Sequence, residues 1–107
     1  MVGLLGSAGQ VNYAASKSGL VGAARSLARE LGGRGITANV IAPGFVDTEM
    51  TAVLSEEQKQ SIVASVPLGR YASVDEIAGV AVFLASPAAS YITGAVVPVD
   101  GGLGMGH

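Results

Sequence analysis

Apolar residues recur at helical spacing in the first third of the chain. Between residues 12 and 31 they follow one another at intervals of three and four, while the charged side chains lie off this stripe. The stripe consists of Leu20, Ala24, Leu27 and Leu31. The ten opening residues are rich in Gly and predict a loop, and Gly32, Gly33 and Gly35 end the tract. We therefore predict an amphipathic helix over 12–31.

Two short runs have the length and composition of strands. The β-branched run 36–42 is followed by Pro43 and Gly44, which is typical of a buried strand and the turn that ends it. A second run covers 95–99. Pro98 lies within it and has no N–H to donate, so we place this strand at a sheet edge.

Two further helices are predicted between the strands. Each begins with a serine that is followed three residues later by Gln or Glu, the capping-box pattern that satisfies backbone N–H groups at a helix start. The pairs are Ser55 with Gln58 and Ser73 with Glu76. The first of these helices ends before Pro67 and the second before Pro87.

The order of elements predicts an α/β fold. A strand, a helical connection and a second strand favour parallel pairing through a right-handed crossover. The chain opens on a helix with no strand before it, and two parallel strands are too few to be flanked at both edges. We therefore predict the C-terminal portion of a Rossmann-type doubly wound parallel sheet, with its N-terminal half absent.

The amino-acid composition excludes several classes of function for this chain. Of the 107 residues 50% are hydrophobic and 13% charged, with a formal net charge of −2, so the chain is not disordered and has no basic stripe for nucleic acid. It has no Cys and one His, at the last position, which leaves no thiolate nucleophile and no metal site. No apolar stretch approaches about eighteen residues, and the N-terminus lacks the pattern of a secretory signal. We expect a cytoplasmic protein without a membrane span.

The residues with the clearest chemistry are Tyr13 and Lys17. They lie four positions apart at the start of the first predicted helix, so their side chains share one face. A phenol is a weak acid at neutral pH, but a neighbouring ammonium favours its anion and lowers its pKa. Such a Tyr could donate a proton to a developing alkoxide. The alternative is a chance spacing, because this pair of residue types is common on helices.

Long stretches around this pair resemble the short-chain dehydrogenase/reductase family. They are residues 12–22, 25–31 and 35–48, and the resemblance extends over essentially the whole chain. Within the family the chain is most similar to the bacterial 3-oxoacyl-(acyl-carrier-protein) reductases, through residues 43–50, 82–85 and 91–94. The tail 98–107 resembles the version from bacteria that make mycolic acids.

This resemblance implies a partial dinucleotide-binding and catalytic domain over residues 1–107. It implies reduction of 3-oxoacyl thioesters in fatty acid biosynthesis with NADPH, with NADH as the alternative cofactor. Tyr13 would protonate the substrate carbonyl oxygen and also bind the cofactor. Lys17 would bind the nicotinamide ribose and lower the pKa of Tyr13.

Four further residues would hold the nicotinamide. Pro43 and Gly44 would lie against its ring, where a side chain on residue 44 would crowd the cofactor. Val46 through its backbone and Thr48 through its hydroxyl would hold the carboxamide. The alternatives are structural, with Pro43 and Gly44 as the turn that ends a strand and Thr48 as a helix cap.

Residues 48–71 correspond to the substrate-binding flap of the family. Six apolar side chains in this segment could line a path for the acyl chain of an acyl-carrier-protein or CoA thioester. They are Met50, Val53, Leu54, Ile62, Val63 and Val66. The alternative, which we favour for most of them, is that they pack the two short helices of the flap.

Parts of the family's machinery are missing from these residues. In the family a Ser that binds the substrate carbonyl lies thirteen residues before the catalytic Tyr, which is position zero here, and Ser7 is too close to Tyr13 to replace it. The glycine-rich phosphate loop, the residue that selects the cofactor and the Asn of the active-site tetrad are also missing. We therefore expect the 107 residues by themselves to be catalytically inert.

The sequence is compatible with three hypotheses. The first is the C-terminal segment of a 3-oxoacyl thioester reductase. The second is a non-catalytic subunit that associates with full-length subunits, because the family forms tetramers partly through the helix at 12–31 and an open strand edge at 36–42 invites pairing. The third is a truncated gene product or expression fragment with no function of its own. The coding sequence upstream of Met1 discriminates between them.

Overall fold

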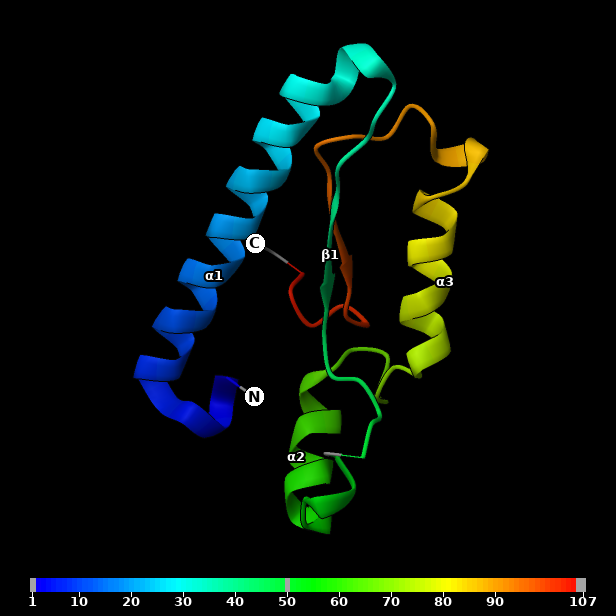
Figure 1. Ribbon diagram of the computed structural model, residues 1–107. Helices are drawn as coiled ribbons and strands as arrows, with labels where there is room; N and C mark the ends of the chain where they lie inside the picture. Colours follow the sequence, from blue (N-terminus) through cyan, green and yellow to red (C-terminus); the bar gives the residue numbers. More distant parts are fainter. Residues whose placement is uncertain (1, 50, 106–107) are drawn as a thin grey trace. The chain divides into compact units, whose positions relative to one another are not determined.

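The computed structural model describes residues 2–49 and 51–105, with side chains from residue 15 onward. In chain order, its main elements are α1 (Val2–Leu31), β1 (Val40–Pro43), α2 (Glu56–Ser65), α3 (Val74–Leu84) and β2 (Val96–Val99) (Figure 1). Three short 3₁₀ helices lie at Gly32–Arg34, Thr51–Val53 and Pro87–Ala89. The chain divides into two compact units, one formed by 1–40 with 91–96 and the other by 41–90 with 97–107.

β1 and β2 pair in a two-stranded sheet. The N–H of Val40 donates to the Ala95 carbonyl at 2.9 Å, and the N–H of Gly44 donates to the Val99 carbonyl at 3.1 Å. The partner numbers rise together along the two strands, so the strands are parallel, as predicted. β1 is shorter than the predicted run 36–42 and is half-exposed, not buried, because the described sheet has no strand on its outer edges.

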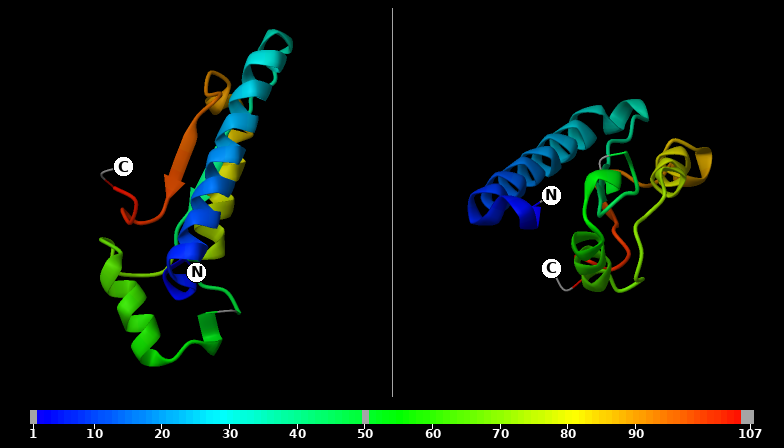
Figure 2. Two further views of the ribbon diagram at one scale, coloured as in Figure 1. Left: turned by 90° about the vertical axis from the view of Figure 1, so that its left-hand side faces the viewer. Right: turned by 90° about the horizontal axis from the view of Figure 1, so that it is seen from below.

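The start of α1 corrects the prediction of a loop over the first ten residues. The helix begins at Val2 and continues through the whole tract to Leu31, and Figure 2 follows it in two further views. Each glycine in a helix interior costs about 1 kcal/mol relative to Ala, which weakens a helix but does not exclude it. No proline interrupts the segment, so the helix predicted over 12–31 extends N-terminally.

α1 packs through a face that differs from the predicted stripe. Ala24 is buried, and a Cβ placed on Gly94 would lie 3.8 Å from the Ala28 Cβ, so this flank of the helix meets the segment before β2. Leu20 and Leu27 are 61% and 46% exposed. The stripe prediction is therefore wrong for these two leucines, because the small side chains that allow close approach decide which face is covered.

Asn39 links the segments that precede the two strands. Its side-chain amide donates to the Ile92 carbonyl at 3.2 Å, and its side-chain oxygen accepts the Ala95 N–H at 3.0 Å. The Ala38 carbonyl accepts the Gly94 N–H at 2.7 Å. These bonds extend the pairing beyond the regular ladder and align the start of β1 with the start of β2.

Both predicted capping boxes are confirmed. The Ser55 hydroxyl accepts the Gln58 N–H at 3.1 Å, and the Gln58 side chain accepts the Ser55 N–H at 2.9 Å. Ser73 and Glu76 make the same reciprocal bonds at 3.2 and 2.9 Å. α2 and α3 begin directly after these serines, since local side chains satisfy the first backbone N–H groups of each helix.

The second unit is held together by close approaches around its C-terminal turn. Val66 is buried, and the Leu68 N–H donates to the Gly101 carbonyl at 3.1 Å. A Cβ on Gly101 would lie 2.7 Å from a Val66 methyl, and one on Gly102 would lie 2.9 Å from the Pro67 ring, so glycine is required at both positions.

Among residues 2–49 and 51–105, none of the helices combines the length and the hydropathy that a membrane span requires.

Candidate functional site

The six predicted site residues fall into two groups. Tyr13 and Lys17 both lie on α1, four positions apart in one continuous helix, so they occupy one face about one turn apart. The side chain of Tyr13 lies outside the described side chains, and that of Lys17 is half-buried. Pro43, Gly44, Val46 and Thr48 lie together in the second unit, on the end of β1 and the segment that follows it.

The backbone around Val46 has a defined direction. Ala72 forms an isolated parallel bridge with Val46: its N–H donates to the Phe45 carbonyl at 2.9 Å, and its carbonyl accepts the Asp47 N–H at 2.8 Å. The carbonyl of one residue and the N–H of the next point in opposite directions across a trans peptide bond. The N–H and the carbonyl of Val46 therefore both point away from Ala72, and they form a donor and acceptor pair on one side of the chain.

Thr48 does not act as a helix cap among the described residues. The short helix after it is stabilised by Thr51, whose hydroxyl accepts the Thr48 N–H at 3.2 Å and lies 2.6 Å from the Thr48 carbonyl oxygen. The Thr51 hydroxyl also lies 2.9 Å from a carboxylate oxygen of Asp47. Thr48 is exposed, and its hydroxyl makes no hydrogen bond to the other described residues. This hydroxyl can therefore bind a ligand.

Gly44 has a structural role that the sequence did not reveal. Its N–H donates to Val99, and a Cβ at this position would lie 2.8 Å from the Asp100 Cβ and 2.9 Å from its Cα. The residue that a side chain on Gly44 would meet in this structure is thus Asp100. β1 ends at Pro43, as predicted, but no turn is assigned at Gly44, because its N–H still pairs with Val99 and the chain continues to the bridge at Val46.

The side chains predicted to line an acyl path differ in their exposure. Val53 is 84% exposed, whereas Val66 is buried under the C-terminal turn. Leu54, Ile62 and Val63 are half-buried. Met50 lies outside the described residues. The assignment of these side chains to a substrate path stays a prediction.

A pocket of about 430 Å³ lies within the second unit. Apolar side chains make up most of its wall, among them Phe45, Val66, Leu68 and Met105, and Arg70, Glu76 and Asp100 also line it. The Phe45 ring meets the Tyr71 ring edge to face, with 6.5 Å between centroids. The Tyr71 hydroxyl is buried without a hydrogen-bond partner in the described part of the chain.

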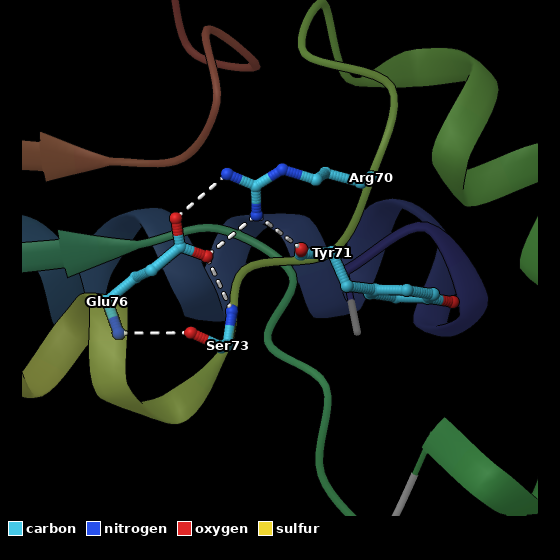
Figure 3. Close-up of polar contacts among 4 residues, drawn as sticks. All are labelled: Arg70, Tyr71, Ser73 and Glu76. Carbon is cyan, nitrogen blue, oxygen red and sulfur yellow. Dashed lines mark hydrogen bonds and ion pairs between the residues drawn. The ribbon is translucent and has the colours of Figure 1, made fainter.

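An ion pair that the sequence analysis missed joins the end of the predicted flap to α3. The Arg70 guanidinium donates to both carboxylate oxygens of Glu76, at 2.7 and 2.8 Å, and to the Tyr71 carbonyl at 3.2 Å (Figure 3). One of these carboxylate oxygens also accepts the Ser73 N–H. Only the capping half of this network was visible in the sequence, because nothing in the local spacing pairs Arg70 with Glu76.

This network lowers the pKa of the Glu76 carboxyl to about 2, mainly through the hydrogen bonds from Arg70 and then from the Ser73 N–H. Its ordinary value is 4.5, so the folded chain binds this proton more weakly than the unfolded chain. The ionised carboxylate therefore stabilises the fold above its ordinary pKa, and this contribution is lost as the pH falls towards 2.

We expect an NMR titration of the Glu76 carboxyl carbon to give a midpoint near 2. In the variant Arg70→Gln the midpoint should move up towards the ordinary value, because the main hydrogen-bond donor is removed. A midpoint in the parent chain close to the ordinary value would show that the ion pair does not form in solution.

No cluster of three or more His, Cys, Asp or Glu side chains that could hold a metal ion occurs among the residues the structure describes. The Tyr–Lys pair on α1 and the backbone and hydroxyl groups after β1 are two candidate groups, one in each unit. Each offers hydrogen-bond donors and acceptors to an organic ligand.

Comparisons with known proteins agree on one family. A family profile described as "Enoyl-(Acyl carrier protein) reductase" matches residues 1–104. The chain is 55% identical over 105 residues to the 3-oxoacyl-(acyl-carrier-protein) reductases FabG of Pseudomonas aeruginosa and MabA of Mycobacterium tuberculosis, which covers 98% of this chain and 42% of each relative. Against FabG of Escherichia coli it is 53% identical over 105 residues, covering 98% of the chain and 43% of the relative. The chain thus spans about two fifths of the length of these curated relatives.

A solved structure supports the same fold. The crystal structure of a blue fluorescent protein from a metagenomic library, in complex with NADPH, aligns with a TM-score of 0.78 and 51% sequence identity. The alignment covers 86% of this chain and 37% of that chain. This similarity confirms the predicted α/β fold class.

Proposed function

Because this chain belongs to the short-chain dehydrogenase/reductase family, we propose that its residues serve in the NADPH-dependent reduction of 3-oxoacyl thioesters to 3-hydroxyacyl thioesters. The observation that carries the proposal is the identity of 53–55%, over 98% of the chain, to reductases named for 3-oxoacyl-(acyl-carrier-protein). The family profile bears the name of an enoyl reductase. The individual relatives carry the proposal, because they share one name and match 98% of the chain at 53–55% identity.

The segment from Pro43 to Thr48 fits a nicotinamide carboxamide. Such an amide offers one carbonyl acceptor and an NH₂ donor, and the N–H and carbonyl of Val46 face one side of the chain as the matching donor and acceptor. The hydroxyl of Thr48 supplies a further hydrogen bond. NADPH bound here would supply hydride to the carbonyl carbon of the substrate, and NADH is the alternative with the same carboxamide.

Tyr13 and Lys17 act at the carbonyl oxygen. As negative charge develops on this oxygen, the Tyr13 phenol donates its proton and the carbonyl becomes a hydroxyl. Lys17 lies one turn further along the same helix face, where its ammonium favours the phenolate that remains and donates to the ribose hydroxyls of the cofactor. The α1 backbone fixes the spacing of this pair.

The substrate is a 3-oxoacyl group carried by acyl-carrier protein or CoA, and residues 48–71 form the flap over it. The assay of this proposal uses a chimera, because the 107 residues contain no glycine-rich pyrophosphate loop and we expect them to be inactive alone. In the chimera, residues 1–105 replace the matched part of Escherichia coli FabG.

We expect the chimera to oxidise NADPH when acetoacetyl-CoA is added, and the isolated 107-residue chain to show no turnover. Two results would contradict the proposal. One is turnover by the isolated chain at the rate of the parent Escherichia coli enzyme. The other is a folded chimera that binds NADPH but does not reduce acetoacetyl-CoA.

A second candidate function is self-association, as a homo-oligomer or with full-length subunits. It is favoured by the exposure of Leu20 and Leu27 on α1, next to the small residues Gly19 and Ala23. Small residues allow two helices to approach closely, and two exposed leucines give them apolar surface to bury. We expect size-exclusion chromatography with light scattering to show a dimer or larger species, and Leu27→Gln to shift it towards the monomer. A parent chain that is monomeric at all concentrations would exclude this function.

A further inference from the structure

The relative position of the Arg70 and Glu76 side chains is more closely fixed than in an ion pair that is joined by one hydrogen bond. The guanidinium and the carboxylate meet through two parallel hydrogen bonds, which is the fork arrangement that fixes both groups in one plane. The Glu76 carboxylate is also held by the Ser73 N–H, and the Arg70 guanidinium by the Tyr71 carbonyl. Five hydrogen bonds among Arg70, Tyr71, Ser73 and Glu76 thus define the path of the chain into α3, as Figure 3 shows.

Ala72 lies in the middle of this fixed segment. Its N–H and carbonyl are both bonded to the residues on either side of Val46, at 2.9 and 2.8 Å. The two backbone hydrogen bonds of Ala72, together with the contact between the Tyr71 and Phe45 rings, thus join the 70–76 segment to residues 45–47. No other bridge of this kind to residues 45–47 occurs in the described part of the chain.

We propose that Arg70 and Glu76 are positioning residues for the cofactor, which hold Ala72 against Phe45 and Asp47 and so aim the N–H and carbonyl of Val46 at the nicotinamide carboxamide. The inference rests on the proposed function for its ligand. Among the described residues, neither Arg70 nor Glu76 makes a hydrogen bond to residues 43–48. The effect of the pair is transmitted through two backbone hydrogen bonds.

The pair acts on the local geometry of the 70–76 segment. Both side chains are about half-exposed, so solvent screens their charges, and the two parallel hydrogen bonds of the fork fix the relative position of the two groups. The variant Glu76→Gln keeps the capping box, because Gln58 already performs this role beside Ser55 in α2. It removes the charge and one acceptor of the fork. The change therefore loosens the 70–73 segment while α3 remains capped.

The matched control is Asp75→Asn. Asp75 lies in the same first turn of α3 as Glu76 and is exposed, so its replacement removes the same charge from the same helix end. It makes no hydrogen bond to Arg70 within the described residues. Glu76→Gln and Asp75→Asn both remove one negative charge near the N-terminus of α3, so the effect of that charge on the helix dipole is common to both variants. Only Glu76→Gln also disrupts the hydrogen bonds to Arg70.

The first measurement is amide hydrogen exchange in the 107-residue chain. In Glu76→Gln and Arg70→Gln we expect exchange of the Asp47 and Ala72 amides to rise about tenfold, which corresponds to about 1.4 kcal/mol in local opening. Arg70→Lys keeps the charge without the fork and should give a smaller rise. The Gly94 amide, in the other unit, and all amides of Asp75→Asn should exchange as in the parent.

Unchanged exchange at Asp47 and Ala72 in the Arg70 and Glu76 variants would overturn the inference. A general loss of protection throughout the second unit would also overturn it, because the pair would then be an element of global stability. The denaturant midpoint of each variant separates these two outcomes from the expected local effect.

The second measurement uses the chimera described above. Arg70→Gln and Glu76→Gln should raise the KM for NADPH about tenfold, as expected for one lost net hydrogen bond, with kcat and the KM for acetoacetyl-CoA within about twofold of the parent. Arg70→Lys should recover part of the loss. An active chimera with an unchanged KM for NADPH in all three variants would overturn the positioning role. An inactive parent chimera would instead contradict the proposed function, and the exchange result alone would then decide whether the pair holds Ala72.

Discussion

Replacing Tyr13 by Phe should lower kcat of the chimera about a thousandfold. The substitution removes one hydroxyl and keeps the aromatic ring, so the carbonyl oxygen loses its proton donor. Positioned general acids contribute about 10²–10⁴ to the rate. We expect the KM for NADPH to stay within about twofold, because the carboxamide contacts are assigned to Val46 and Thr48. Steady-state oxidation of NADPH in the presence of acetoacetyl-CoA measures both parameters.

The matched control for this variant is Tyr91→Phe. Tyr91 is fully exposed in the other part of the same unit, and its replacement removes the same hydroxyl. We expect it to leave kcat unchanged. If Tyr13→Phe retained more than about a tenth of the parent rate, Tyr13 would not be the proton donor.

Replacing Gly44 by Ala should destabilise the second unit by about 2 kcal/mol, within the range measured for overpacked interiors. The added Cβ would lie 2.8 Å from the Asp100 Cβ and 2.9 Å from its Cα, and neither atom can move without a shift of the backbone after β2. The Gly44–Val99 hydrogen bond at the end of β1 should weaken as the strands separate. Chemical denaturation of the chain measures this loss.

Gly79→Ala is a control with the opposite expected sign. Gly79 lies in α3, and nothing lies within 4 Å of a Cβ placed there. Alanine in a helix interior is more favourable than glycine by about 1 kcal/mol, so this variant should be more stable than the parent. A Gly44→Ala chain as stable as the parent would mean that β1 and the Asp100 turn do not approach as closely as described.

Features that depend on neighbouring residues were predictable from the sequence. The capping boxes at Ser55 and Ser73 involve atoms only three residues apart, so the sequence pattern contains the whole interaction. Parallel pairing of the two strands joins segments far apart in the chain, and it was predictable because a helical connection between two strands favours the parallel arrangement. Both predictions are confirmed.

Features that depend on distant partners were missed or wrong. The buried face of α1 is set by Gly94, far along the chain, and so Leu20 and Leu27 are exposed despite their helical spacing. The direction of the Val46 backbone is set by Ala72, and the collision that requires glycine at position 44 is with Asp100. No local pattern reveals these contacts.

The candidate site shows the same division. The Tyr13–Lys17 spacing was readable from the sequence, because an i, i+4 pair on a helix needs only the helix itself. The contribution of Arg70 could not be predicted from the sequence. Arg70 lies in a loop and Glu76 at a helix start six positions later, and a two-bond ion pair at this spacing has no periodic sequence pattern. Such contacts emerge only when the chain path between them is known.

The central claim is that these residues direct hydride transfer to the carbonyl of a 3-oxoacyl thioester. The most direct measurement follows the hydride itself, with NADPH deuterated at the transferable position of the nicotinamide and acetoacetyl-CoA as substrate of the chimera. We predict 3-hydroxybutyryl-CoA that carries the deuterium at C3, and no such product from Tyr13→Phe on the same time scale. Oxidation of the labelled cofactor without deuterium at C3, or equal labelling by the Tyr13→Phe chimera, would contradict the account.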